Sequence, residues 1–424
     1  MGDQWKRRFN DDLCTVITVP VMARPCTGFA PPQFATARII YSQPDARAKV
    51  IVVTDQQSLK FLEELTNCFG PSGFEREPAR IVKRYVSDFS DKVYSDKLGS
   101  LMFEKKGTAD NPIVLIPGHI DEVGFIISSI NKLGFLTFNP LGGWFDQVLL
   151  GQRVLVKTEK GIVPGVIAAK PPHLLPAEER SKVVLKEKMF VDIGASNEEE
   201  AKAMGIRVGN PVIPDSHFSM MQKKVFKDGK RNGSDTIAIG KAFDDRIGTW
   251  IAAEAVRTLV QKKISHPNTV IGAATTQEEV GLRGARTAAY VTKPDVCLTL
   301  EVDIAGDVPG IEANEAASKM GYGPTLTTWD TSMIPNQGLV ELVLKTANQK
   351  KIPIQLSQVK GGTDAGVIHM AYAGCPSVVL GVPTRHIHAH VGLLSMQDAE
   401  YCIRLVIELV KKLDKKTVAG LTEV

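Results

Sequence analysis

Hydrophobic and polar positions alternate between helical and strand periods from Ser58 onward. SLKFLEEL, which starts at Ser58, and EREPARIVKRYVSDFS at 75–90 repeat apolar residues three and four positions apart. This spacing predicts two amphipathic helices. NPIVLIPGH at 111–119 contains instead the unbroken apolar run Ile113–Ile116, which is typical of a strand buried on both faces.

The same alternation returns after residue 240. Predicted helices and strands follow one another as the helix DDRIGTWIAAEAVRTLVQKK at 244–263, the strand TVIGAAT at 269–275, the short helix GLRGARTAAY at 281–290, the strand DVCLTLEVD at 295–303, the helix LVELVLKTANQK at 339–350 and the strand PSVVLGVP at 376–383. A final long helix is introduced by Ser395-Met-Gln-Asp398, a helix-capping sequence. Alternating strands and helices predict an α/β domain with a mostly parallel sheet covered by helices.

The segment between these parts has a different character. Residues 125–239 are rich in Gly and Pro and contain short β-type segments such as FIISSI and QRVLVKT. We therefore expect a β-domain inserted at 125–239 into an α/β domain made of residues 56–124 and 240–424. Residues 1–55 show no such pattern, and we expect a disordered extension or an over-long start of the chain.

Composition excludes several classes of protein. The 424 residues are 43% hydrophobic and 23% charged, which is ordinary for a soluble globular protein. The 51 basic and 47 acidic residues give a net charge of +4 without a basic cluster, so we expect no nucleic-acid partner. No apolar run reaches about 18 residues, so we expect no membrane span. The six scattered cysteines include no C-x-x-C pair, which favours a reducing, cytoplasmic location.

Potential metal ligands gather at the ends of the predicted strands, where open α/β sheets bind their ligands. Five sets stand there: Gly118-His119-Ile120-Asp121, Asp244-Asp245, Glu278-Glu279, Glu301-Val302-Asp303 and His386-Ile387-His388-Ala389-His390. Taken singly, an acidic pair could cap a helix or lie in solvent. Taken together at one sheet edge, they would leave many charges crowded without partners.

Two zinc-like ions would resolve this crowding, because such metals bind His nitrogen and carboxylate oxygen. The ligands would be His119, Asp244, Glu279, Asp303 and His388. Three carboxylates and a bridging hydroxide carry four negative charges, which balance two divalent ions. Glu278 then remains as a carboxylate beside the metal-held water, the place of a general base.

Six motifs with these residues resemble, in order and spacing, a known family. They are GHIDEVGF, KAFDDRIG, TTQEEVG, LEVD, GGTDAGVIH and PTRHIHAHVG, and FGPSGFE at 69–75 precedes them. The chain from Ser58 to its last helix resembles the tetrahedral (TET-type) dinuclear metallo-aminopeptidases, which include glutamyl and deblocking aminopeptidases. The resemblance implies an αβα-sandwich metallopeptidase domain, an inserted β-barrel-like dimerisation domain, peptide substrates and a homo-oligomer in which dimers form a hollow dodecamer.

The resemblance also implies roles for single residues. His119 and Asp303 would bind one Zn or Co ion, Glu279 and His388 a second, and Asp244 would bridge them. The Asp244–Asp245 peptide bond is expected to be cis.

Two residues would act beside the metals in this family. Glu278 would be the general base, and Asp121 would orient the imidazole of His119. The choice of His388 over His386 and His390 rests on the resemblance, since the residues alone leave all three open.

Other functions fit the same sequence less well. A dinuclear deacylase or carboxypeptidase could use the same ligands. A glycosidase (endoglucanase) needs two carboxyl groups facing each other across a sugar and has no use for the histidines. A non-catalytic scaffold would have lost ligands, whereas here every ligand position is filled.

Overall fold

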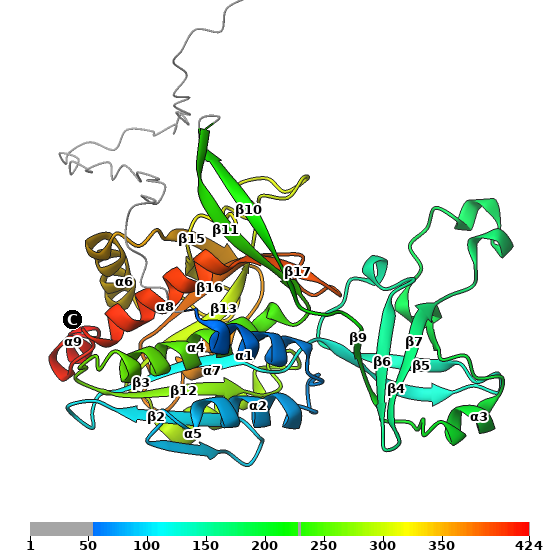
Figure 1. Ribbon diagram of the computed structural model, residues 1–424, viewed down its shortest axis with the longest axis horizontal. Coiled ribbons are helices and arrows are strands. Elements are labelled where there is room, and N and C mark those ends of the chain that lie inside the picture. Colours follow the sequence, from blue (N-terminus) through cyan, green and yellow to red (C-terminus); the bar gives the residue numbers. More distant parts are fainter. Residues whose placement is uncertain (1–53, 228–229, 424) are drawn as a thin grey trace, which may run out of the picture. The chain divides into compact units, whose positions relative to one another are not determined.

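The computed structural model describes residues 54–227 and 230–423 (Figure 1). The expectation for residues 1–55 therefore lies outside the described residues, except for the last two. The first element is helix α1 (Gln56–Asn67), capped by Asp55, whose carboxylate accepts a hydrogen bond from the Ser58 amide at 2.9 Å. The fold thus begins two residues before the start that the helical periodicity predicted.

A mixed sheet of eleven strands forms the centre of the larger domain, in the order β1-β2-β12-β3-β13-β16-β17-β11-β10, with β14 attached to β16 and β15 to β14. Its strands are β1 (Lys92–Ser95), β2 (Leu101–Lys106), β3 (Ile113–His119), β10 (Ser219–Lys227), β11 (Lys230–Gly240), β12 (Thr269–Thr275), β13 (Val296–Ile304), β14 (Thr325–Asp330), β15 (Gln355–Val359), β16 (Ser377–Arg385) and β17 (Gly392–Ser395).

The prediction of a mostly parallel sheet is right for its centre. Strands β12, β3, β13 and β16 run parallel to one another, and β14 is parallel to β15. The strands toward both edges pair antiparallel, including β1 with β2 and β10 with β11. These two pairs are each consecutive in the chain and joined by short connections, which only antiparallel strands allow.

Helices cover both faces of the sheet, as the alternating pattern predicted. Val114 and Ile116 of β3 point to a core shared with one group of helices, and Leu115 between them points to the opposite core. The first group is α1, α2 (Arg76–Val86), α4 (Phe243–Gln261), α6 (Gln337–Lys350) and α8 (Met396–Val410). The second is α5 (Arg283–Thr292) and α7 (Ala365–Ile368), and α9 (Lys415–Gly420) follows α8. The domain is the expected αβα sandwich.

The inserted β-domain is a closed six-stranded barrel in the order β4-β5-β8-β7-β6-β9. It consists of β4 (Gly124–Ile130), β5 (Leu136–Leu141), β6 (Arg153–Thr158), β7 (Gly161–Ala168), β8 (Phe190–Asp192) and β9 (Pro211–Pro214), together with α3 (Glu198–Ala203) and the short helices η1 (Asp146–Val148), η2 (Pro172–Leu174), η3 (Ala177–Glu179) and η4 (Lys186–Lys188). The barrel has its own core, in which Phe125 stacks on Trp144.

The barrel is shorter than the insertion expected at 125–239. It closes with β9 at Pro214, and the following hairpin of β10 and β11 pairs with β17 in the large sheet. Sequence periodicity indicates a strand but not its partner, so the hairpin looks like a continuation of the β-domain in sequence alone.

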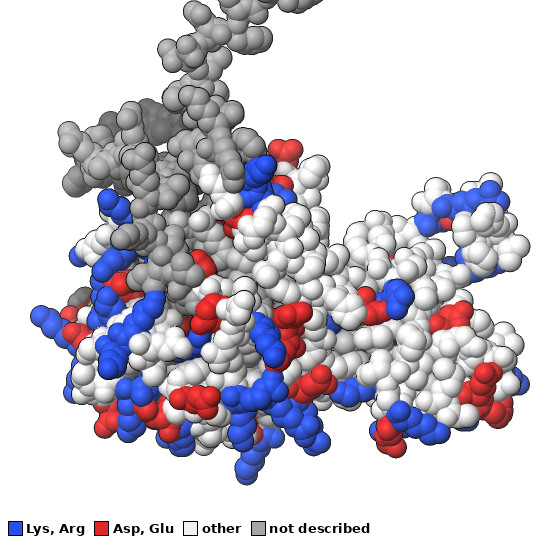
Figure 2. All heavy atoms as spheres, in the orientation of Figure 1, with Lys and Arg blue, Asp and Glu red and all other residues white. Residues whose placement is uncertain are grey.

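The surface is mixed in charge where it can be followed. On the face drawn in Figure 2, Lys and Arg side chains are interspersed with Asp and Glu. Within residues 54–227 and 230–423, no helix combines the length and the apolar character needed to cross a membrane.

A fully buried arginine joins the parts of the αβα domain that surround the strand ends. Arg246, in the first turn of α4, donates hydrogen bonds at 2.9–3.1 Å to four carbonyl groups: that of Leu65 in the last turn of α1, those of Cys68 and Gly70 after α1, and that of Ile120 after β3. Its guanidinium also contacts the Glu122 carboxylate at 3.0 Å.

The same carboxylate is shared with a second buried cation. Lys241 Nζ lies 2.7 and 2.8 Å from the two oxygens of Glu122 and donates to the Cys68 carbonyl at 3.0 Å. All three charged side chains are almost completely buried, so each depends on the others for compensation.

We predict that Arg246→Leu lowers the free energy of unfolding by about 3–5 kcal/mol, because it removes a donor from each of these buried carbonyl groups and leaves Glu122 with one cation. Urea unfolding at fixed protein concentration measures the change. Arg84→Leu is the control: Arg84 pairs with Glu64 on the surface, and its loss should cost no more than about 1 kcal/mol. Equal midpoints for the two variants would contradict the role given to Arg246.

Candidate metal centre

Parallel register brings the predicted ligand sets to one edge of the sheet. Thr275, the last residue of β12, lies opposite His119, the last residue of β3. Glu278 and Glu279 follow β12 directly and thus reach the same edge. Asp244 stands at the start of α4, which packs on these strands, and His388 follows β16.

Asp244 stands between two histidines. Its Oδ1 lies 3.1 Å from Nε2 of His119, and its Oδ2 lies 3.2 Å from Nε2 of His388. The latter nitrogen is also 3.4 Å from Oε2 of Glu279. Asp244 thus directs one carboxylate oxygen to His119 and the other to His388. This is the arrangement of a bridging group.

Asp245 has a different task, although it is the neighbour of Asp244. Its carboxylate accepts hydrogen bonds from the backbone amides of His119 (3.1 Å) and Gly248 (3.0 Å). The helix-capping interpretation therefore holds for Asp245, whereas Asp244 faces the cluster. The peptide bond between them is cis, as expected.

The structure brings Glu301, not Asp303, to the cluster. Oε1 of Glu301 lies 4.0 Å from Nε2 of His119, and these two residues form one group of potential ligands with Glu278. His119, Asp244 and Glu279 form the other group. Asp303 belongs to neither group.

The register of β13 explains this difference. Cys297 pairs with Leu115 of β3, so four residues further along each strand Glu301 comes level with His119. Asp303 lies two residues beyond, where burial raises the pKa of its carboxyl group beside the Thr325 and Ser357 hydroxyls. Both acidic residues point to the same side of the strand, so periodicity could not choose between them.

Asp121 lies where it can orient His119. The Nδ1 atom of His119 is 3.1 Å from the Asp121 carbonyl oxygen and 3.5 Å from the Asp121 carboxylate. With Nδ1 held by this acceptor, Nε2 is left to face the cluster.

Of the three C-terminal histidines, His388 is the one that faces the cluster. His390 is buried against Trp144 with a ring-centroid distance of 5.4 Å, and burial lowers its pKa to about 4. Within the described residues, His388 pairs with Asp244 and Glu279, whereas His386 forms no ion pair with the carboxylates of the cluster. A barrel loop closes this side, since a Cβ atom on Gly143 would lie 3.2 Å from Nδ1 of His388.

The cluster crowds negative charge into a buried space. Burial raises the pKa of Glu279 to about 8, and the charge of Asp244 adds to this shift. Burial also raises the pKa of Glu278 and of Glu301 well above the usual range. For His388 burial acts in the opposite direction, but the Asp244 and Glu279 carboxylates raise its pKa to about 9.

These residues fit divalent metal ions. Oε1 of Glu279 is buried without a hydrogen-bond partner, which is costly unless something else compensates it. Imidazole nitrogens together with carboxylate oxygens are the donors that zinc and similar ions take in proteins. A cation held by these donors would keep the carboxylates ionised despite their burial.

Sequence reasoning assigned no role to three buried carboxylates around this centre, those of Glu75, Glu301 and Asp364. Glu301 was present among the candidates, but only register could select it. Glu75 lies in the FGPSGFE motif and Asp364 in GGTDAG, and Asp364 contacts the Thr275 hydroxyl at the end of β12. Both motifs are part of the resemblance, but the resemblance does not say what their acidic residues contact.

Comparison with known proteins agrees with this geometry. The profile of the family described as M42 glutamyl aminopeptidase matches residues 99–405. The glutamyl aminopeptidase of Lactococcus lactis is 33% identical over 82% of this chain and 94% of its own length. The TET aminopeptidase of the marine sediment archaeon Thaumarchaeota archaeon SCGC AB-539-E09 is 58% identical, with a TM-score of 0.81 over 86% of this chain and 99% of that one.

A second solved structure extends the match. The TET1 peptidase of Pyrococcus horikoshii, which can assemble into a tetrahedron or a large octahedral shell, is 31% identical, with a TM-score of 0.71 over 84% of this chain and 100% of that one. Together with the αβα sandwich, the inserted barrel and the His–carboxylate cluster, these matches show that the chain is a peptide hydrolase of the M42 glutamyl aminopeptidase family.

Proposed function

We propose that this metal-dependent enzyme releases N-terminal residues from peptides at a site for two divalent ions, zinc or cobalt. The observation that carries the proposal is the position of Asp244 between His119 and His388, with one oxygen toward each. The ions would be held by His119, Asp244, Glu279, Glu301 and His388. Glu301 takes the place that the resemblance assigns to Asp303.

Charge balance supports two ions rather than one. Asp244, Glu279 and Glu301 provide three carboxylates, and Glu278 beside them is a fourth. Two divalent cations balance four negative charges, so the buried cluster would carry no net charge. A single cation would leave an excess of buried negative charge, which is unfavourable.

When bound, such ions polarise the carbonyl group of the substrate and lower the pKa of water. The residues supply the proton transfers. Glu278 lies 3.8 Å from Nε2 of His119, and its buried carboxylate has a raised pKa, which suits a group that takes a proton and holds it. Glu278 would remove a proton from the attacking water and return it to the amine that leaves.

Asp121 would act on the same centre through His119. Its contact with His119 Nδ1 keeps the imidazole in one orientation and one tautomer. Because Nε2 then has no proton of its own, it can serve as a donor of an electron pair to a cation.

We further propose that the protein is a cytoplasmic homo-oligomer, in which barrels join chains into dimers and dimers form a dodecamer. The shells reported for the TET1 peptidase support this arrangement. So do apolar side chains exposed on the barrel, which are Leu133, Phe145, Leu150, Ile162, Val166, Leu174, Val183, Leu185 and Val208. The free, buried state of Cys68, Cys297, Cys375 and Cys402 is consistent with a reducing compartment.

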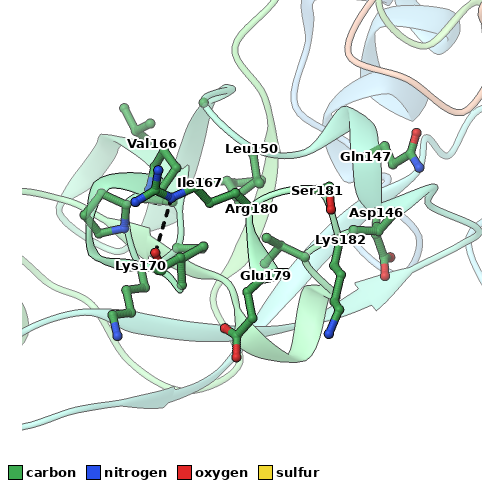
Figure 3. Close-up of a pocket in the computed structure, with 18 residues that line it drawn as sticks. Asp146, Gln147, Leu150, Val166, Ile167, Lys170, Glu179, Arg180, Ser181 and Lys182 are labelled. Atoms are coloured by element: carbon green, nitrogen blue, oxygen red, sulfur yellow. Dashed lines mark hydrogen bonds between the residues drawn. The ribbon is translucent and has the colours of Figure 1, made fainter. Parts of the chain in front are cut away.

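One exposed part of the barrel is hollowed. A cavity of about 550 Å³ lies beside β7, with Leu150, Val166 and Ile167 among its apolar lining (Figure 3). Arg180 is held over it by a hydrogen bond to the Leu175 carbonyl at 3.2 Å. A concave apolar surface of this kind suits contact with another chain.

Light scattering tests the proposed assembly, for which twelve 46.1-kDa chains would give a mass of about 550 kDa.

The function is tested with unblocked and N-acetylated aminoacyl-p-nitroanilides. We expect cleavage of the unblocked substrates only, its loss with EDTA and its return with Zn²⁺ or Co²⁺, because the ligands hold exchangeable divalent ions. The residue cleaved fastest would reveal the side-chain preference. Release of acetate from the acetylated set would favour a deacylase instead.

Replacement of the proposed base tests the mechanism. We predict that Glu278→Gln lowers kcat by about 10²–10⁴-fold, since general-base catalysis contributes that much, while the metal content stays at the wild-type value. Glu341→Gln on the exposed face of α6 is the control and should leave kcat unchanged. Normal turnover in the Glu278 variant would rule out its role as base.

The choice between two acidic residues of β13 is open to direct measurement. We predict that Glu301→Ala reduces the metal content, measured by plasma mass spectrometry, by about one ion per chain, because it removes a ligand. Asp303→Ala should retain the wild-type content. The reverse result would return the ligand role to Asp303.

A further inference from the structure

The chain takes an unfavourable conformation directly before the proposed base. Gln277 has a φ of +56°, a left-handed conformation in which Cβ crowds the backbone of any residue except glycine. Such a residue persists only where the surroundings hold it. Its neighbours in sequence are Glu278 and Glu279, so the turn at Gln277 sets the direction in which both carboxylates leave the end of β12.

Two buried carboxylates hold the backbone of this segment from one side. The Gln277 amide donates to Oε1 of Glu75 at 3.1 Å. The next two amides, those of Glu278 and Glu279, donate to the two oxygens of Asp121 at 3.0 and 3.3 Å. Three consecutive N–H groups thus bind carboxylates in place of strand or helix partners.

The other side of the segment is held by the start of α5. The Glu278 carbonyl accepts hydrogen bonds from the amides of Gly281 and Leu282, both at 2.9 Å. The Thr276 carbonyl accepts from Gly284 at 2.8 Å. With donors and acceptors engaged on opposite sides, the backbone of the proposed base has little freedom to shift.

Glu75 is itself fixed in place. Its side chain is 6% exposed, and the oxygen that binds Gln277 also accepts from the Gly73 amide at 2.6 Å. Among the described residues, neither group of potential metal ligands includes Glu75. Its contacts therefore reach the centre through the backbone of the Gln277 segment.

We propose that Glu75 is a positioning residue for the reaction: by binding the Gln277 amide it maintains the left-handed turn that aims Glu278 at the substrate. This inference rests on the proposed role of Glu278. It gives the FGPSGFE motif a function, since Gly73 and Glu75 form the loop that meets the catalytic segment. The acceptor position of Oε1, not the charge of the carboxylate, is the feature required.

The experiment compares three substitutions of Glu75 in the intact enzyme, with an unblocked aminoacyl-p-nitroanilide as substrate. Glu75→Gln retains the acceptor and should keep kcat close to the wild-type value. Glu75→Asp keeps the charge but withdraws the acceptor by one methylene, and Glu75→Leu removes it. Both should lower kcat about 10- to 100-fold, the cost of a small misplacement of a catalytic group, with KM and metal content unchanged.

Glu77→Leu is the matched control, because Glu77 lies two residues further on, in the first turn of α2, and pairs with Lys157 instead. It should retain kcat. Unfolding midpoints of all variants are measured alongside, and Glu75→Asp keeps the comparison possible should the leucine variant fail to fold.

A double substitution separates positioning from a general structural role. If Glu75 acts through the proposed base, Glu75→Asp should cause no further loss of kcat in the Glu278→Gln background. An equal loss in both backgrounds, a loss of metal in the Glu75 variants, or an inactive Glu75→Gln would overturn the inference. Unchanged kcat in Glu75→Asp would also overturn the inference if Glu278→Gln is inactive. An active Glu278→Gln would instead refute the proposed function.

Discussion

The buried Arg246 guanidinium is the constraint on which the arrangement of this domain depends. It collects carbonyl groups from the end of α1 and from the end of β3, and it binds Glu122 together with Lys241. These carbonyl groups lie where α1 and β3 end and their regular hydrogen bonding stops. The five donors of one guanidinium therefore take the place of backbone partners. The end of β3 held in this way carries His119 and Asp121.

The charges of the neighbouring cluster around Asp244, unlike those at Arg246, do not compensate one another. At Arg246 the buried charges compensate one another, whereas around Asp244 four carboxylates meet two histidines. Burial alone pushes the pKa of Glu278, Glu279 and Glu301 upward. The two regions lie side by side along β3, so a rigid, compensated network supports a centre whose own charges require cations.

Most of this centre was accessible from the sequence because strand ends in an α/β fold share one edge of the sheet. His119, Asp244, Glu278, Glu279 and His388 all lie where that rule places them. The exception was the acidic pair on β13, in which both residues satisfy the rule and only the register with β3 brings Glu301 level with His119. The expected end of the insertion at residue 239 differs from the end of the barrel at β9 for a related reason. The β10–β11 hairpin pairs with β17, which lies far along the chain.

The sequence by itself determined the order of helices and strands, the αβα class and the residue types of the centre, because periodicity and local motifs act over a few neighbouring residues. Tertiary structure alone decided which carboxylate faces the cluster, which acidic neighbour caps α4 instead, and how Glu75 reaches Gln277 across about two hundred residues of chain. Those contacts follow from register and from the burial of charge. Both arise only when distant segments pack against each other, so no local pattern can record them.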